Sequence, residues 1–80
     1  MKIIVSKRNS NTPYNFVWND ETYEVWICYP LKDGREHCVQ VEGNAKTEDE
    51  AIEIANEHVM NSTDVLRERE LNLRIEGLID

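Results

Sequence analysis

The chain has 80 residues, with nine Lys and Arg against sixteen Asp and Glu, which gives a formal net charge of −7 at pH 7. This length fits one small domain, because globular domains usually hold about 50–200 residues. Direct contact with DNA, RNA or an anionic membrane is disfavoured, since those ligands are bound through clusters of Lys and Arg. Apolar residues make up 40% of the chain, enough for folding rather than disorder. We therefore expect one acidic globular domain over residues 1–80.

No segment predicts export or membrane insertion. The apolar run Ile3–Val5 ends at Ser6, short of the roughly 7–15 apolar residues of a signal peptide. Nothing approaches the roughly 18 apolar residues of a membrane-spanning helix. We therefore expect a cytoplasmic protein, and because that compartment is reducing, we favour free thiols at Cys28 and Cys38 over the single cross-strand disulfide that they could form.

Strands are predicted over most of the first 43 residues. The runs 2–7, 14–18 and 22–29 are rich in β-branched and aromatic residues, and the polar segments 8–13 and 19–21 separate them. In the second run, aromatic side chains alternate with Asn and Val. The third run is the clearest strand of the chain.

A hairpin follows the third run. In Lys32-Asp33-Gly34, a glycine after a type I turn supplies the left-handed residue of a three-residue loop. This loop would pair Ile27 with Val39 and Cys28 with Cys38. It gathers six apolar side chains on one sheet face, and a slip of one residue would mix them with polar ones. They are Tyr23, Val25, Ile27, Tyr29, Val39 and Val41.

A helix is predicted from about Glu48 to Met60. Thr47 and Glu50 have the spacing of a capping box, in which each side chain binds backbone N–H groups of the first turn. Small and branched apolar residues then recur with the helical period and would pack on the sheet. They are Ala51, Ile52, Ala55 and Val59, flanked by Ile54 and His58.

Residues 64–79 support two interpretations. Leu71, Leu73 and Ile75 alternate with polar residues, which favours a strand. A helical stripe also fits, made of Leu71, Ile75, Leu78 and Ile79. We favour the strand, because it would cover a sheet edge, while a second helix would need another apolar face. The expected fold class is α+β: an antiparallel meander of three to four strands, one amphipathic helix on one face and a C-terminal closing strand.

The chain carries no motif of a known catalytic site. Its glycines lie apart, which excludes a glycine-rich phosphate loop. Cys28, Cys38 and His37 are ligand types that zinc accepts, but His37 faces the other side of the predicted sheet. Neighbouring carboxylates such as Asp20 and Glu21 lack a cleft that would perturb one of them. We expect no enzymatic activity, no metal and no cofactor.

Two surfaces are candidates for binding a partner. On the outer side of the helix lie Asp49, Glu53 and Glu57, with no Lys or Arg four residues on to neutralise them. A role in solubility alone would explain such a ridge, and the alternative is attraction to a basic surface, on which it would imitate phosphates. Trp26 faces away from the helix, and we place Trp18 beside it as a second apolar anchor. Two alternatives stay open for Trp26: the first strand and the tail shield its side chain, or two copies of the chain associate through it.

The helix start is similar to known binding proteins. The segment Ala45–Ala55, AKTEDEAIEIA, resembles the strand-to-helix corner of small phage proteins that inhibit host machinery, namely the inhibitor of host RNA polymerase and several anti-CRISPR proteins. Together with Tyr23–Val25 and Tyr29-Pro30, it also resembles the partial-RNase-H-like domain of HicB-type antitoxins, although this chain inserts the hairpin Leu31–Val41 before the helix. Neither resemblance assigns a role to a residue. Both imply a binding protein on a small α+β frame.

The predicted function is therefore stoichiometric binding of a larger, basic protein or nucleoprotein complex. The chain would act as a phage-type inhibitor of a host nucleic-acid-processing complex, by mimicry of nucleic acid. The alternative is a HicB-like antitoxin or regulatory domain that masks a partner enzyme and is acidic only for solubility. The expected partner-binding residues are Glu48, Asp49, Glu50, Glu53, Glu57, Trp26 and Trp18.

Overall fold

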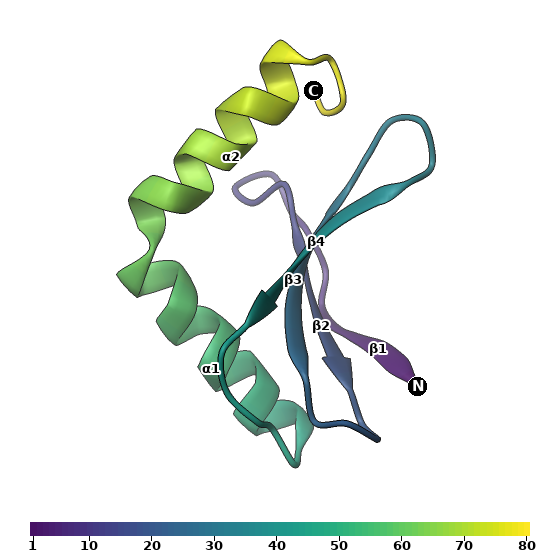
Figure 1. Ribbon diagram of the computed structural model, residues 1–80, viewed down its shortest axis with the longest axis vertical. Coiled ribbons are helices and arrows are strands. Elements are labelled where there is room, and N and C mark those ends of the chain that lie inside the picture. The colour runs from purple at the N-terminus through teal and green to yellow at the C-terminus, as the bar shows by residue number, and fades with distance from the viewer.

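A computed structural model describes residues 1–80 as an antiparallel sheet with two helices (Figure 1). The four strands lie in the order β1-β2-β3-β4, so each strand pairs with its neighbour in the chain. The elements are β1 (Lys2–Ser6), β2 (Asn15–Asn19), β3 (Val25–Pro30), β4 (Glu36–Val41), α1 (Glu48–Asn61) and α2 (Thr63–Ile75). The α+β class and the meander are confirmed, and the C-terminal segment is a helix instead of a strand.

The β3–β4 hairpin has the predicted register. Its pairs run from Val25 opposite Val41 to Pro30 opposite Glu36. The loop closes through Gly34, whose φ of 91° lies in the region that only glycine adopts at little cost. Because side chains alternate along a strand, this one turn fixes which face of the sheet every hairpin residue occupies.

The core lies between the sheet and the helices. Val25, Ile27 and Tyr29 are fully buried, as the hairpin register predicts. Tyr23 was expected among them, but this was wrong: its φ is 65°, it lies between the turn at residues 20–22 and the start of β3, and it is 40% exposed. The buried hydrophobic cluster consists of Phe16, Trp18, Val25, Ile27, Tyr29, Val41, Ala45, Ala51, Ala55, Leu66, Leu73 and Ile79.

The start of α1 is a capping box. The Thr47 hydroxyl accepts a hydrogen bond from the Glu50 backbone N–H at 3.2 Å, and the Glu50 carboxylate accepts one from the Lys46 backbone N–H at 2.9 Å. The first bond satisfies a donor that the first turn of a helix leaves free, and the second reaches the Lys46 N–H, one residue before the position that a capping box predicts for it. The helix therefore begins where the sequence predicts, and it ends at Asn61, before the half-buried Ser62.

The buried side of α1 is narrow. Ala51 and Ala55 are fully buried, and Ile54 and Val59 pack against the core beside them. Ile52, which the helical period places on the same stripe, lies half-buried at the edge of the outer side instead. The small alanines let α1 approach the sheet closely.

The second helix contradicts the predicted closing strand. Leu66 and Leu73, two turns apart, are buried, whereas Leu71 and Ile75, which suggested alternation, are 56% and 74% exposed. Strong helix formers, mainly Leu, Arg and Glu, fill the segment. An ion pair of 3.0 Å between Glu70 and Arg74 links successive turns.

The chain after α2 turns back toward the β3–β4 loop (Figure 1). The Lys32 backbone N–H donates to the Leu78 carbonyl at 2.8 Å, and the Ile79 side chain is buried in the core. The C-terminal residues thus dock on the hairpin without forming a strand.

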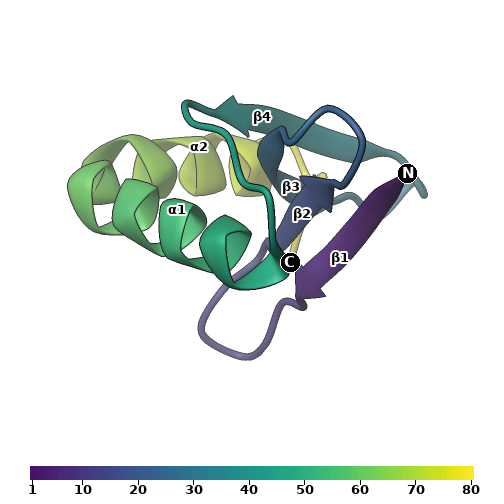
Figure 2. The same cartoon turned by 90° about the horizontal axis from the view of Figure 1, so that it is seen from below.

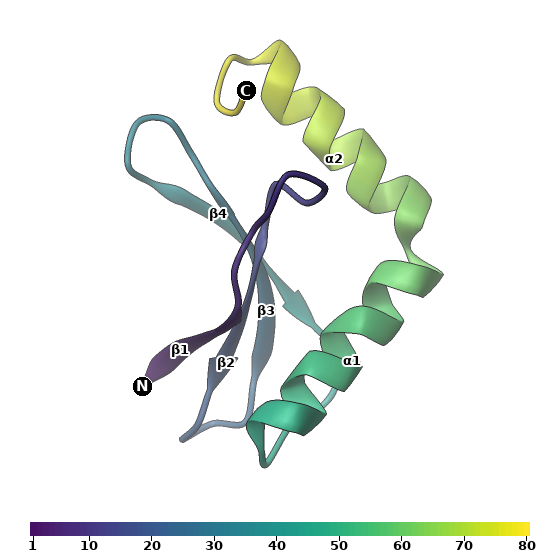
Figure 3. The same cartoon turned by 180° about the vertical axis from the view of Figure 1, so that it is seen from behind.

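Both helices lie on one side of the sheet (Figures 2 and 3). The outer side, which carries Lys2, Val17 and Trp26, has no second layer of helix or strand over it. The sheet packs one face against the helices, and on its outer face Lys2 is exposed and Trp26 half-buried, while Val17 and Cys28 are buried.

Gly43, between β4 and α1, is a position where a side chain should not fit. Its φ is 135°, and a Cβ there would lie 3.3 Å from Ile54 Cγ2, which packs on the core. We expect Gly43→Ala to lower the free energy of unfolding by about 1–3 kcal/mol, from backbone strain and from displacement of Ile54. Urea unfolding measures this loss. Gly77→Ala is the matched control, since Gly77 also has positive φ but open space around it; an equal loss in both variants would mean that contact with Ile54 contributes nothing.

Candidate partner-binding surface

The outer side of α1 carries three carboxylates that no cation neutralises. Asp49, Glu53 and Glu57 are exposed, and none takes part in any of the ion pairs of the chain. They share a shallow hollow of about 500 Å³ with uncharged neighbours. We define the α1 acidic face as the residues that line this hollow: Asp49, Ile52, Glu53, Asn56, Glu57, Met60 and Asn61.

Glu48 and Glu50 have local roles at the helix start. The Glu50 carboxylate is engaged by the Lys46 backbone N–H. Glu48 lies in the first turn, where negative charge stabilises a helix through its dipole. These two acids are exposed as expected, but the requirements of the fold already account for them.

Apolar side chains interrupt the charges of the α1 acidic face. Met60 is 79% exposed, and Ile52 is half-buried. Methionine is flexible and polarisable, so it adapts to the shape of a partner. The sequence pattern missed both residues, because it placed Ile52 in the core and took Met60 only as the end of the helix. The combination of acids with apolar contact area suits a protein partner.

Trp18 is not a surface anchor, contrary to the prediction. It lies on the core face of β2, is 8% exposed, and donates a buried hydrogen bond from Nε1 to the Ala45 carbonyl at 2.8 Å. The reason is the alternation of β2, in which Trp18 pairs with Val25 and shares the core face with Phe16. A partner cannot reach this side chain in the folded protein.

Trp26 lies on the outer face of the sheet, as predicted. It is half-buried, and the Lys2 ammonium sits 4.8 Å from the centre of its ring, within range of a cation–π contact. Helix α1 packs on the other face of the same sheet (Figure 2). The structure therefore does not bring Trp26 and the α1 acidic face together into one surface.

The two cysteines are joined, so the expectation of free thiols was wrong. Cys28 and Cys38 form a disulfide across the β3–β4 pair, where the register places them directly opposite each other with their Cα atoms 4.0 Å apart. Glu36 contributes the third donor atom of this cluster, within 4.8 Å of both sulfurs. His37 points to the other sheet face, as predicted. Sulfurs bonded to each other are not thiolates, and the thiolate is the form that ligates zinc.

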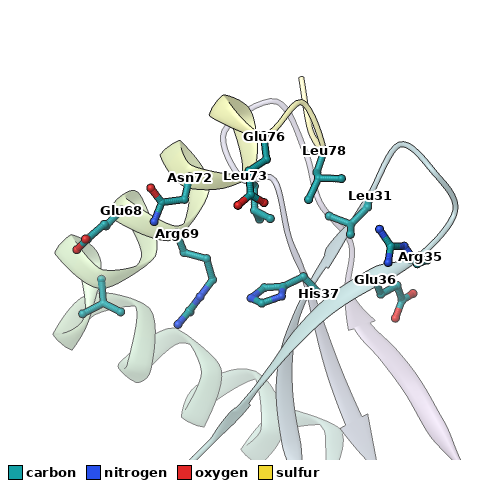
Figure 4. A pocket seen from close by; sticks show the side chains of 11 residues that line it. Leu31, Arg35, Glu36, His37, Glu68, Arg69, Asn72, Leu73, Glu76 and Leu78 are labelled. Carbon is teal, nitrogen blue, oxygen red and sulfur yellow. The ribbon is translucent and has the colours of Figure 1, made fainter.

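A larger hollow lies between α2 and the β3–β4 hairpin (Figure 4). Its volume is about 630 Å³, and Arg69 of α2 and His37 of β4 point toward each other across it. No pattern in the sequence predicts this hollow, because it exists only when residues 63–75 are a helix.

Neither helix is long and apolar enough to cross a membrane. Comparisons of the chain with protein-family models, with curated proteins and with solved structures found no match. The resemblance to phage inhibitors and to HicB-type antitoxins therefore stays a prediction, and the chemistry of the surfaces carries the functional argument.

Proposed function

We propose that the chain is a non-enzymatic binding module whose α1 acidic face docks on a basic surface of a larger protein. The observation that carries this proposal is the row Asp49, Glu53 and Glu57, exposed and without an ion pair. Uncompensated charge of one sign steers association with a surface of the opposite sign and strengthens the encounter. Met60 and Ile52 would then add apolar contact in the bound state.

The spacing of the row supports mimicry of a nucleic-acid backbone. Successive carboxylates are four residues apart, which corresponds to about 6 Å along a helix axis. Neighbouring phosphates of one DNA strand rise about 3.4 Å along the duplex axis and also turn around it, so the distance between them is larger than this rise and comparable to the carboxylate interval. Three carboxylates at this interval would fit cationic groups arranged for phosphates. The proposed activity is stoichiometric inhibition, in which the chain occupies the nucleic-acid site of a processing complex in the manner of a phage inhibitor.

Charge reversal tests the proposal. The variant carrying Asp49→Lys, Glu53→Lys and Glu57→Lys should bind the partner about 100-fold more weakly. Each reversal removes an attraction and adds a repulsion, and the two together cost about 1 kcal/mol of binding free energy per residue. The partner is first captured from native host lysate, and its affinity is then measured by titration over a salt series. Binding of the parent chain should weaken steeply with salt, and labelled nucleic acid should compete with it.

The matched control reverses three exposed acids elsewhere. Glu42→Lys, Glu68→Lys and Glu76→Lys change the net charge by the same amount but leave the α1 acidic face intact. Circular dichroism confirms that α1 survives the loss of Asp49 from its first turn. If both variants lost the same affinity for the partner, the effect would come from net charge and not from the α1 acidic face. An affinity indifferent to salt, with a toxic RNase as the captured partner, would favour the antitoxin alternative instead.

A further inference from the structure

The hollow between α2 and β4 contains the one basic side chain that the fold partly buries. Of the nine Lys and Arg residues, eight are exposed, and Arg69 alone is half-buried. Its guanidinium forms no ion pair, and its Nη1 atom is buried without a hydrogen-bond partner. A partly desolvated cation without a counterion is unfavourable, so this arrangement calls for an anion from outside the chain.

The surroundings of Arg69 hold the guanidinium in place. The Tyr29 side chain is fully buried, its hydroxyl lies beside the Arg69 guanidinium without a well-formed hydrogen bond, and its ring lies 6.1 Å from the His37 ring. Burial raises the pKa of Tyr29, with Arg69 acting in the opposite direction, so the hydroxyl stays protonated at neutral pH. Arg69 therefore finds no anionic partner on the core side, and the rest of its guanidinium faces the hollow (Figure 4).

Most of the other charged groups of the hollow are occupied or turned away, and the exception is Glu76, which lines the α2 end of the hollow and forms no ion pair. Arg35 is bound to Asp33 through Nη2 and Nε, at 2.6 and 2.7 Å. The Glu36 carboxylate lies near Cys38 Sγ, at 3.6 Å, on the opposite face of β4. Glu68 points away from the centre in Figure 4. The centre is consequently left to Arg69 and His37, both of which can donate hydrogen bonds to an anion.

The walls of the hollow indicate what kind of anion would fit. Leu31, Leu73 and Leu78 line the end beside the hairpin and the C-terminal turn. Glu76, on the α2 side, would repel a doubly charged phosphate more strongly than a singly charged group. A carboxylate also matches the planar fork of a guanidinium.

We propose that the hollow between α2 and β4 binds a small carboxylate with an apolar body. The carboxylate would contact Arg69 and His37, and the apolar part would lie against Leu31, Leu73 and Leu78. This site lies on α2 and β4 and is separate from the α1 acidic face, so it stands or falls independently of the proposed function.

Titration of the folded chain with hexanoate, followed by ¹H–¹⁵N NMR, tests this inference. We expect shifts at His37, Arg69 and Leu73, and no such shifts with hexanol, which has the same body without the charge. Arg69→Gln should weaken hexanoate binding by about tenfold or more, because a charge-assisted hydrogen bond is lost. Arg67→Gln, the loss of an exposed arginine on the same helix, should leave the affinity unchanged.

Three outcomes would overturn the inference. If hexanol bound as tightly as hexanoate, the hollow would be a purely apolar site. If inorganic phosphate bound as tightly as hexanoate, it would be a general anion site. Absence of shifts with hexanoate at any attainable concentration would remove the site altogether. Folding of Arg69→Gln is checked in the same spectra, and we expect it to persist, because the substitution removes an uncompensated charge from the folded state.

Discussion

Replacing Trp18 with alanine is expected to lower the free energy of unfolding by about 3–5 kcal/mol. The side chain is 8% exposed within the hydrophobic core, and its Nε1 hydrogen bond to the Ala45 carbonyl holds the segment that leads into α1. A small domain has a total stability of about 5–15 kcal/mol, so this one substitution removes a large part of it. Urea unfolding followed by circular dichroism measures the loss.

Trp26→Ala is the matched control for this prediction. The same residue type is removed from the outer face, where the ring is half-buried, and we expect a loss of about 1–2 kcal/mol. Trp18→Phe keeps most of the packing and isolates the hydrogen bond, which contributes about 1 kcal/mol. A Trp18→Ala variant no less stable than Trp26→Ala would place Trp18 at the surface and restore it as a contact residue.

Patterns of a few neighbouring residues predicted the elements whose structure depends only on such neighbours. The Gly34 turn fixed the whole β3–β4 register, because alternation carries one turn's geometry along both strands. Thr47 and Glu50 marked the start of α1 for the same reason: capping depends only on neighbours in the chain. Exposure of Asp49, Glu53 and Glu57 followed from the helical period once that start was known.

The C-terminal segment could not be assigned from its apolar pattern. The alternation included Leu71 and Ile75, which the fold leaves largely exposed, and the residues that bury it, Leu66 and Leu73, are two helical turns apart. The sheet and α1 together form the apolar surface against which α2 packs. The residues of α2 alone therefore do not predict that surface. Glu70 and Arg74 carry opposite charges four residues apart, and this spacing is a pattern that favours a helix.

The sheet face on which a side chain lies could be predicted only where the pairing of its strand could be predicted. Trp26 was placed correctly because the hairpin register determines its face. Trp18 was placed wrongly because the orientation of β2 depends on its pairing with β3, for which the turn at residues 19–21 gave no register. The hollow around Arg69 required both α2 and β4, two elements far apart in the sequence. Contacts over long sequence separations therefore account for α2 and the hollow, whereas the errors at Trp18 and Tyr23 arose from the short connection between β2 and β3.

The disulfide on the outer sheet face gives the second large effect. Reduction of Cys28–Cys38 is expected to lower the free energy of unfolding by about 2–3 kcal/mol, because the bond closes a loop of sequence separation 10 and so limits the unfolded chain. The hairpin register should persist after reduction, since Val25, Ile27 and Val41 hold it from the core face. Urea unfolding with and without reductant measures the difference.

The control for reduction is the double variant Cys28→Ala, Cys38→Ala, whose unfolding should not respond to reductant. The oxidised parent should also show a smaller dependence of stability on urea, because a cross-linked unfolded chain exposes less surface. Equal midpoints for the oxidised and reduced parent would mean that the hairpin is already closed in the unfolded chain. In that case the turn at Gly34 and the apolar cross-strand pairs, rather than the covalent bond, would hold β3 and β4 together.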